Sequence, residues 1–486
     1  MGILGTFFKK APGPDGADQD ARSLAPETQP LEGSAPVQNG QGGEPEGAAD
    51  RAEVDTDALP VRESVAAVLP VATHGERTSA RALRQRILGR RPILDGEQRL
   101  VGYELALRTH APPEDNPALA QMHDDLLLRS LATLPLVRLA KGMRTWVGLS
   151  LASLDHPALR ILPQEGITLV LRVLAGEEGE AVSHIARLTA EGYAVALDDA
   201  PFDPGVMAGC LHQLAFVRLD LGRSDALALD QRIRALGARS ATPLVVQGVD
   251  TDDGFEACRN LSFQWFQGYY FAQRQPAKPA RIDSERMRVI ELLNKVASRA
   301  EIKELEAQIK RDAALSYKLM RYINSPGCGL AQKVHSIGHA LVALGYGPLY
   351  RWLTLLLFTS GQLDMRAQAL LRDATVRGRL METLGLQRLP PPEADGLFIT
   401  GIFSLLDVLL NMPMEQALAR ISLPEPVAEA LLRRQGPYAP LLALAVACGS
   451  DDRERTEEYA AACRLDAETV NAAHVDAMIW AEELEA

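Results

Sequence analysis

The sequence contains no uninterrupted apolar run of 18 residues, so we expect no membrane span and a cytoplasmic protein. Its five cysteines form no Cys-x-x-Cys pair and have no histidine at metal-binding spacing, which predicts reduced core thiols rather than disulfides or a zinc site. The net charge of −12 disfavours nonspecific binding to nucleic acid. These absences exclude membrane-embedded proteins, disulfide-stapled secreted domains and general nucleic-acid binders.

The first part of the chain lacks the residues that build a core. Residues 11–80 contain no phenylalanine, tyrosine or tryptophan and are rich in alanine, glycine, proline and acidic residues. Such a stretch buries too little apolar surface to offset the conformational entropy that is lost on ordering. Residues 1–80 also hold 13 acidic and 6 basic residues, a net charge of −7. We therefore predict a disordered acidic tail over residues 1–80.

From about Arg81 onward, short apolar runs alternate with longer amphipathic segments. The runs lie at residues 100–105, 145–149, 167–173, 194–197, 216–219, 243–246 and 265–271. Alternation of strand-like and helix-like segments predicts a parallel sheet, and this many repeats predict a closed barrel. We therefore predict an α/β TIM-like barrel over residues 81–277.

A basic, proline-containing stretch at residues 274–281 has the composition of a linker. Beyond it, apolar residues recur at three- and four-residue spacing with little interruption, at 301–320, 340–357, 397–410, 426–432 and 460–479. This spacing is typical of helices that each bury one face. Residues 284–486 are therefore predicted to form an all-α domain.

Four stretches of the barrel half carry a specific resemblance. They are Arg90-Arg91-Pro92-Ile93, Gly102-Tyr103-Glu104-Leu105-Ala106-Leu107-Arg108, Ala196-Leu197-Asp198-Asp199 and Gln267-Gly268-Tyr269-Tyr270-Phe271. In order and spacing they resemble the EAL domain. That family folds as a modified TIM barrel and hydrolyses the bacterial second messenger cyclic di-GMP with two divalent ions, so the resemblance implies this fold and ancestry.

A two-metal site needs several oxygen ligands around Mg²⁺ or Mn²⁺ ions that lie about 3.5–4 Å apart. The resemblance implies that Glu104 corresponds to a metal-binding glutamate and Arg108 to an arginine that contacts substrate. It also implies that Asp198 and Asp199 correspond to the family's aspartate pair, and Asp220 to the acid of the next strand. The alternative for these acids is a solvated strand end.

Several positions depart from the family pattern. Gly148 stands in place of a metal-binding asparagine, Arg172 of a metal-binding glutamate, Arg218 of the catalytic lysine, Gln247 of a further glutamate and Arg91 of a substrate-contacting glutamine. A register two residues earlier would place Val170 at the position of the first glutamate, and neither side chain can ligate Mg²⁺. About half of the metal ligands are thus missing. We predict a site that does not catalyse and expect no cofactor, with Mg²⁺ or Mn²⁺ needed if the site is active.

The retained acids would repel one another in a partly buried mouth without metal. An arginine at a former ligand position would point into that mouth, because alternate residues of a strand share a face. Our hypothesis is that Arg172 or Arg218 supplies the missing positive charge through ion pairs. The alternative is that both side chains reach into solvent.

The helical half resembles the HDOD domain at residues 311–319, 323–325 and 340–345. HDOD domains resemble HD phosphohydrolases in fold but lack their catalytic residues. A metal-dependent HD site needs an adjacent His-Asp pair, and the only such dipeptide, His123-Asp124, lies in the barrel half. The histidines of the helical half, His335, His339 and His474, have no such partner in the sequence.

The sequence favours a noncatalytic signalling scaffold, in which a degenerate barrel is joined to a helical domain that recruits protein partners. A second hypothesis is a cyclic di-GMP receptor that binds without cleavage, using Arg108 and the retained acids; the loss of metal ligands and the replacement of a glutamine by Arg91 weaken it. The candidate ligand-binding residues are Arg91, Glu104, Arg108, Asp198, Asp199 and Asp220. A third is an active phosphodiesterase with substitute ligands such as Glu177 or Glu178. The sequence leaves the partner, the pathway and the oligomeric state open.

Overall fold

The computed structural model describes residues 87–107, 116–198, 209–223, 226–275, 282–324, 333–361, 365–386, 388–389, 391–450 and 453–483. The predicted tail at 1–80 lies outside these ranges. So do two of the predicted site residues, Arg108 and Asp199.

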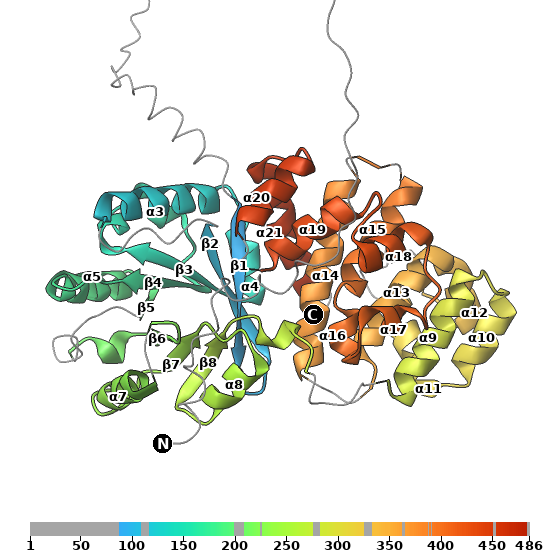
Figure 1. The fold of residues 1–486 in the computed structure, drawn as a ribbon, viewed down its shortest axis with the longest axis horizontal. Coiled ribbons are helices and arrows are strands. Elements are labelled where there is room, and N and C mark those ends of the chain that lie inside the picture. Colours follow the sequence, from blue (N-terminus) through green and yellow to red (C-terminus); the bar gives the residue numbers. More distant parts are fainter. Residues whose placement is uncertain are drawn as a thin grey trace, which may run out of the picture. The chain divides into compact units, whose positions relative to one another are not determined.

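Eight strands close into a barrel in sequence order; Figure 1 labels them. They are β1 (Leu88–Asp95), β2 (Leu100–Leu107), β3 (Arg144–Ser150), β4 (Ile167–Arg172), β5 (Ala194–Leu197), β6 (Val217–Asp220), β7 (Leu244–Gln247) and β8 (Phe263–Gln267). Strands β2 to β8 are parallel, whereas β1 runs antiparallel to both of its neighbours, β2 and β8. The predicted barrel is confirmed.

The reversed strand β1 corrects the expectation of an entirely parallel sheet. Asp95 and Arg99 close a short turn, in which Asp95 N donates to Arg99 O at 3.0 Å and Arg99 N donates to Asp95 Oδ1 at 2.9 Å. A turn this short can join only antiparallel strands, because a parallel connection needs a crossover of a dozen or more residues.

The interior of the barrel is filled by a compact apolar layer. Trp146 and Phe216 pack with ring centroids 4.1 Å apart and their planes tilted by 32°, and Trp265 meets Trp146 edge-on. Val170 belongs to the same layer and is fully buried. Arg172 lies two residues further along β4, so it shares this face and emerges at the strand end. The register with Arg172 at the mouth is therefore the one that the barrel adopts.

Helices surround the barrel on its outside (Figure 1). They are α3 (Pro117–Ala132), α4 (Leu136–Gly142), α5 (Glu178–Ala190), α7 (Ala226–Gly237) and α8 (Asp252–Arg259). Short 3₁₀ helices lie between them, η2 (Leu151–Ser153), η3 (Pro157–Ile161), η4 (Leu211–Gln213) and η5 (Tyr270–Ala272). Helix α3 begins with a side-chain cap from Asn116 to the Leu119 amide at 3.1 Å, followed by Pro117 in the first turn. It packs against β2 and β3.

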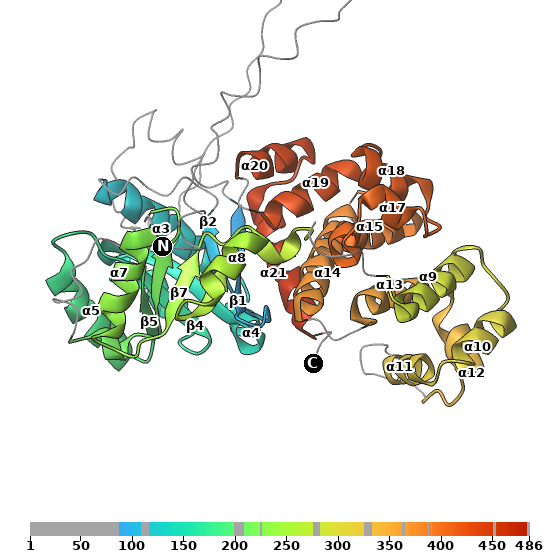
Figure 2. The ribbon, with the colours of Figure 1, turned by 60° about the horizontal axis from the view of Figure 1, so that its bottom comes forward.

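The described residues from 282 onward form helices and no strand, as predicted. The helices are α9 (Ser284–Ala297), α10 (Ile302–Lys310), α11 (Ala313–Ile323), α12 (Ile337–Leu344), α13 (Tyr346–Thr359), α14 (Met365–Gly385), α15 (Pro391–Phe403), α16 (Leu406–Leu410), α17 (Met414–Leu418), α18 (Glu425–Arg433), α19 (Ala439–Cys448), α20 (Arg453–Ala462) and α21 (Ala467–Glu483). The long helix α14 is central, because it packs against α13, α15, α19 and α21 (Figure 2).

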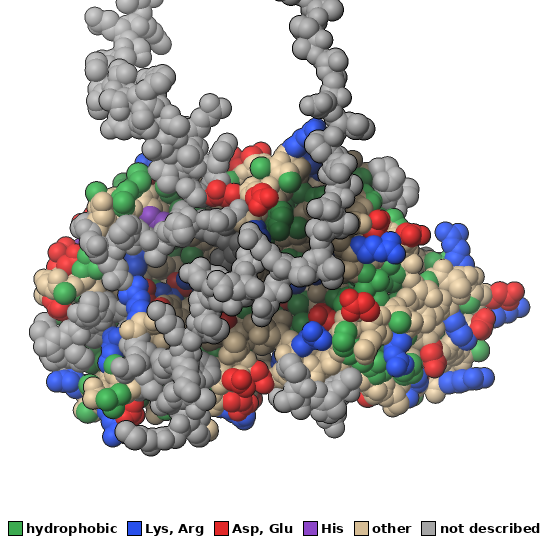
Figure 3. Space-filling view, in the orientation of Figure 1, with side chains coloured by type: hydrophobic (Ala, Val, Ile, Leu, Met, Phe, Trp, Pro, Cys, Tyr) green, Lys and Arg blue, Asp and Glu red, His purple; other side chains and the backbone are tan. Residues whose placement is uncertain are grey.

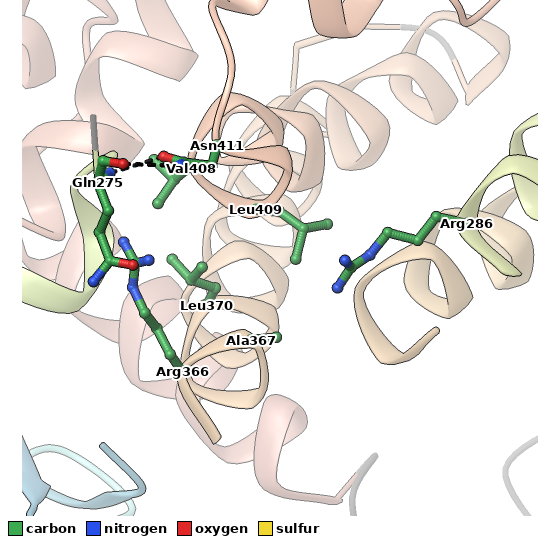
Figure 4. A pocket seen from close by; sticks show the side chains of 8 residues that line it. All are labelled: Gln275, Arg286, Arg366, Ala367, Leu370, Val408, Leu409 and Asn411. Carbon is green, nitrogen blue, oxygen red and sulfur yellow. Dashed lines mark hydrogen bonds between the residues drawn. The ribbon is translucent and has the colours of Figure 1, made fainter. Parts of the chain in front are cut away.

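Arg366 and Asn411 bind the chain segment that leaves the barrel; both side chains are drawn in Figure 4. Arg366 on α14 donates from Nε to the Phe271 carbonyl at 2.9 Å. Asn411 and Gln275 form a reciprocal pair, in which the Gln275 amide donates to Asn411 Oδ1 and Asn411 Nδ2 donates to the Gln275 carbonyl, both at 2.8 Å. The backbone of the segment is therefore held by side chains of the helical domain, and the side chains of Gln273 and Gln275 donate to the Asp250 carbonyl and to Asp252 Oδ1.

Among the described residues, no single helix is long and apolar enough to cross a membrane; the bent pair α12 and α13 reaches that length and composition only jointly, across a 109° angle. On the described part of the face in Figure 3, basic and acidic side chains are interspersed over the helical domain. That part of this face therefore offers no continuous basic patch of the kind that tracks nucleic acid.

Candidate functional site

The mouth of the barrel gathers most of the predicted site residues. The carboxyl ends of parallel strands meet at one edge of a barrel, which is where TIM-barrel enzymes place their chemistry. The described positions are Glu104 on β2, Gly148 on β3, Arg172 at the end of β4, Asp198 after β5, Arg218 and Asp220 on β6, Gln247 on β7 and Arg91 on β1.

One side of the mouth is built around Arg218, whose side chain is almost fully buried. Its Nε donates to Asp198 Oδ1 at 2.9 Å, and its Nη2 lies 2.8 Å from Asp198 Oδ2. Its Nη1 donates to Glu104 Oε1 at 2.8 Å and to Gln267 Oε1 at 3.1 Å. Gln267 in turn donates to Glu104 Oε2 at 2.7 Å. We call these four residues the Arg218 cluster.

The opposite charges of Arg218 and Glu104 favour the ionised form of each other in spite of their burial. Burial by itself would raise the pKa of Glu104, but the guanidiniums of Arg218 and Arg91 outweigh it and hold that pKa below its usual range. Burial likewise works to lower the pKa of Arg218, and Asp198 together with Glu104 raises it instead. The hypothesis that Arg218 supplies positive charge to the retained acids therefore agrees with the geometry.

Arg172 behaves differently from Arg218. Its guanidinium pairs with Asp124 of helix α3, and its side chain is 29% exposed. Asp124 is fully buried, and its Oδ2 accepts from the Ser150 amide at 2.7 Å, from Ser150 Oγ at 2.6 Å and from Ser153 Oγ at 3.0 Å. His123 Nδ1 lies 3.2 Å from Asp124 Oδ1. We call these five residues the Asp124 cluster.

The Asp124 carboxylate is strongly stabilised in its charged form. Burial would raise its pKa, but the hydrogen bond with His123, the charge of Arg172 and the Ser150 donors lower it to about 2. The sequence pointed to His123-Asp124 only as a dipeptide without metal partners, and this role was missed. A signal was present, because Asp124 shares a helical face with the buried Leu127, Leu128 and Leu131. A lone acid in such an apolar stripe needs buried donors.

A small open hollow of about 170 Å³ lies beside the Arg218 cluster. It is lined by Arg91, Asp220, Gln247, Gly248, Asp250, Gln267, Gly268 and Tyr269. Gln247 Nε2 donates to Asp220 Oδ2 at 2.6 Å, and the Gly222 amide donates to Asp220 Oδ1 at 2.7 Å. Arg91 is 42% exposed, with Nη1 3.7 Å from Glu104 Oε2. The hollow therefore presents one accessible guanidinium next to carboxylates that already accept hydrogen bonds.

The described residues do not fit a two-metal centre. Both carboxylate oxygens of Glu104 and of Asp198 are engaged by hydrogen bonds or ion pairs, which come from Arg218 and, at Glu104 Oε2, from Gln267. A Cβ added at Gly148 would lie 3.5 Å from Glu104 Oε1 and 4.0 Å from Arg172 Nη1, so this position faces the mouth without offering a ligand atom. Among the described residues, no group of three or more histidine, cysteine, aspartate or glutamate side chains is placed to hold a metal ion.

The described histidines of the helical domain lie at two places, around the start of α12 and on α21. His335 and His339 are exposed around the start of α12, where the His339 amide donates to the capping Ser336 Oγ at 3.2 Å. His474 is buried on α21. In the described part of the helical domain they therefore form no shared site.

Comparisons with known proteins follow the same division of the chain. Residues 282–417 match the HDOD domain family. The chain is 26% identical over 410 residues to the "Uncharacterized protein YuxH" of Bacillus subtilis (strain 168), covering 82% of this chain and 98% of that protein. It is 26% identical over 409 residues to the "Cyclic di-GMP phosphodiesterase CdgJ" of Vibrio cholerae, covering 82% and 92%.

Among solved structures, the "PaMucR Phosphodiesterase, c-di-GMP complex" matches 40% of this chain and 98% of its own, with 20% identity and a TM-score of 0.33. The helical family match and the relatives that span both halves agree with the motifs in the barrel. These findings support a tandem EAL and HDOD architecture, in which an EAL-type barrel is followed by a domain that matches the HDOD family.

Proposed function

We propose that this protein is a scaffold of cyclic di-GMP signalling, in which the EAL-type barrel does not hydrolyse the nucleotide and the HDOD domain contacts protein partners. The link to cyclic di-GMP is supported by the relative that is named a cyclic di-GMP phosphodiesterase. The alignment with this relative covers 82% of the present chain and therefore extends over both the barrel and the helical domain.

The observation that carries the proposal is the position of Arg218. Its guanidinium binds Glu104 and Asp198, the two described acids that the EAL resemblance assigns to metal binding. A divalent ion would have to displace a buried cation that makes ion pairs with both. Removing one partner of such a buried network costs about 3–5 kcal/mol, which opposes metal uptake at these acids.

A second candidate function is a receptor that binds cyclic di-GMP without cleaving it. The specific observation in its favour is the hollow beside Arg91, whose guanidinium is 42% exposed, together with the partly exposed Arg172. Two accessible guanidiniums at one mouth suit a ligand that carries phosphate groups. Metal is not required for this mode of binding.

Contact with a protein partner is supported by the surface of the HDOD domain. Tyr317 on α11 and Val342 on α12 are 67% and 68% exposed, and these two helices pack against each other. Large apolar side chains at the surface favour a contact site, although single exposed ones are common. Tyr317→Glu and Val342→Glu in the full chain are expected to weaken partner capture, with the exposed Leu227→Glu on α7 as the matched control.

One experiment separates the candidate functions of the barrel. The full chain is titrated calorimetrically with cyclic di-GMP, with and without Mn²⁺, and the same sample is assayed for the linear product. Absence of binding heat supports the scaffold. Binding without product supports the receptor, and product formation overturns the proposal of an inactive barrel. An Arg91→Ala variant is expected to weaken receptor binding, while the ion pairs of Arg218 with Glu104 and Asp198 remain.

A further inference from the structure

The outer face of β1 carries a charged residue that is buried against the helical domain. Arg90 is 2% exposed, and its guanidinium forms an ion pair with Asp373 of α14. Asp373 also pairs with Arg377, one turn further along α14, at 2.8 Å. A buried ion pair fixes geometry strongly, because separating the partners leaves an uncompensated charge. The position of β1 is thus tied to α14.

Backbone and apolar contacts reinforce this attachment. The Leu88 amide at the start of β1 donates to Asn471 Oδ1 of α21 at 2.7 Å. The Arg90 guanidinium lies over the ring of Tyr103 on β2, 5.3 Å from its centroid. The apolar side chains around the outside of the barrel and those of the helical domain form one continuous buried cluster. Strand β1 therefore packs as part of both cores.

The inner face of the same strand reaches the mouth. Neighbouring residues of a strand point to opposite faces, so Arg90 faces α14 while Arg91 faces Glu104, at 3.7 Å. Tyr269, which lines the mouth hollow, donates from its hydroxyl to the Arg90 carbonyl at 2.5 Å. Glu104 lies directly opposite Arg91 in the β1–β2 ladder. Two adjacent residues of β1 thus belong to two different ion networks.

We infer that β1 couples the mouth of the barrel to helix α14, so that a change in the Arg218 cluster alters the helical domain and a change at Asp373 alters the mouth. The coupling is supported by the adjacency of Arg90 and Arg91 on β1. Arg90 pairs with Asp373 of α14, and Arg91 lies beside Glu104 of the Arg218 cluster. The inference does not depend on whether the barrel hydrolyses a nucleotide. It gives the HDOD domain a means of responding to the state of the mouth.

The Asp124 cluster supplies an internal control. Its described hydrogen bonds and ion pairs connect α3, β3, η2 and the end of β4. None of these bonds reaches β1. A perturbation there disturbs the same mouth without acting on Arg90 or Arg91, so coupling through β1 predicts no effect on α14.

Hydrogen–deuterium exchange of the full chain tests the inference. Arg218→Met is expected to raise exchange in β1 and β2 and also, by at least about threefold, in residues 366–380 of α14. Asp373→Asn is expected to raise exchange at residues 104–107 and 265–268, since coupling between two sites is reciprocal. Arg172→Ala is expected to raise exchange only in α3, β3 and β4.

Glu104→Gln, which keeps the side-chain shape, replaces Arg218→Met if the latter does not fold. Unchanged exchange in α14 while exchange rises in β2 would overturn the inference. An equal rise over the whole chain would also overturn it, because that reports general destabilisation rather than coupling through β1. A rise in α14 with Arg172→Ala of the same size as with the Arg218 cluster variant would likewise contradict it.

Discussion

The Arg218 cluster and the Asp124 cluster each stabilise a buried charge at the barrel mouth, but the central charge is positive in the first and negative in the second. In the Arg218 cluster, a buried cation is surrounded by carboxylates from β2 and the end of β5. In the Asp124 cluster, a buried anion is surrounded by an arginine, a histidine and two serines. Both arginines stand where the EAL resemblance places other residues. The difference lies in where each arginine finds its partner. Arg218 pairs with acids that the EAL resemblance already places at the mouth, whereas Arg172 pairs with Asp124 of helix α3.

The largest expected effect comes from removing the central cation. Arg218→Met leaves Glu104, 3% exposed, and Asp198 without their common partner. We expect a loss of about 3–5 kcal/mol in the free energy of unfolding, measured by urea denaturation at pH 7.5. The double variant Arg218→Met/Glu104→Gln should recover part of this loss. A cost below about 1 kcal/mol for the single variant would contradict the importance assigned to the cation.

A smaller effect is expected when Arg172 is changed to the acid that the family resemblance assigns to this position. Arg172→Glu would face the fully buried Asp124 with a like charge, and we expect a loss of about 2–3 kcal/mol. Arg172→Ala should cost only about 1 kcal/mol, because the serines and His123 still donate to Asp124. Urea denaturation of both variants measures the comparison. An equal loss of unfolding free energy in Arg172→Glu and Arg172→Ala would show that Asp124 does not repel a carboxylate at position 172.

The anion-centred cluster should also produce a pH dependence. The pKa of Asp124 is lowered from 3.8 to about 2 in the folded protein. Its contribution to the free energy of unfolding is therefore complete above the pKa of the unfolded state and is lost as the pH falls through the pKa of the folded state. We expect a contribution of about 2 kcal/mol that disappears between about pH 4 and pH 2. Denaturation across this window should be flatter in Asp124→Asn than in the natural sequence. Parallel curves for the two proteins would refute this origin of the acid sensitivity.

The smallest effect is expected at Gly148. A Cβ there makes only ordinary van der Waals contacts, so Gly148→Asn should change the free energy of unfolding by no more than about 1 kcal/mol. Calorimetric titration of this variant with Mn²⁺ should show no binding heat, because Arg218 still binds Glu104 and Asp198. Metal binding after this single change would mean that the Arg218 cluster opens readily.

The sequence predicted the barrel and the helical domain because both follow from local periodicity, which side-chain burial enforces. It placed Arg218 and Gly148 at the mouth because they stand within recognisable strand motifs. It did not predict β1 as an antiparallel strand, since the decisive feature is the length of the turn from Asp95 to Arg99. Periodicity does not report turn length.

The Asp124 cluster was harder to predict for a different reason. Its members come from a helix, two strand ends and a 3₁₀ turn, and no spacing in the sequence relates Asp124 to Arg172. The hydrogen-bonding role of Gln267 was likewise missed, although this residue stands within a recognised motif. Partners of this kind are fixed by tertiary packing and leave only weak local signals.

The ion pairs of Arg218 have a consequence for how the mouth responds to its surroundings. A counter-ion that is part of the chain has a fixed, very high effective concentration at its partners, because it cannot diffuse away. A dissociable metal ion would instead fill the same place only as far as its free concentration allowed. On the proposal of a mouth without metal, we expect the geometry of the Arg218 cluster to be the same with and without a chelator.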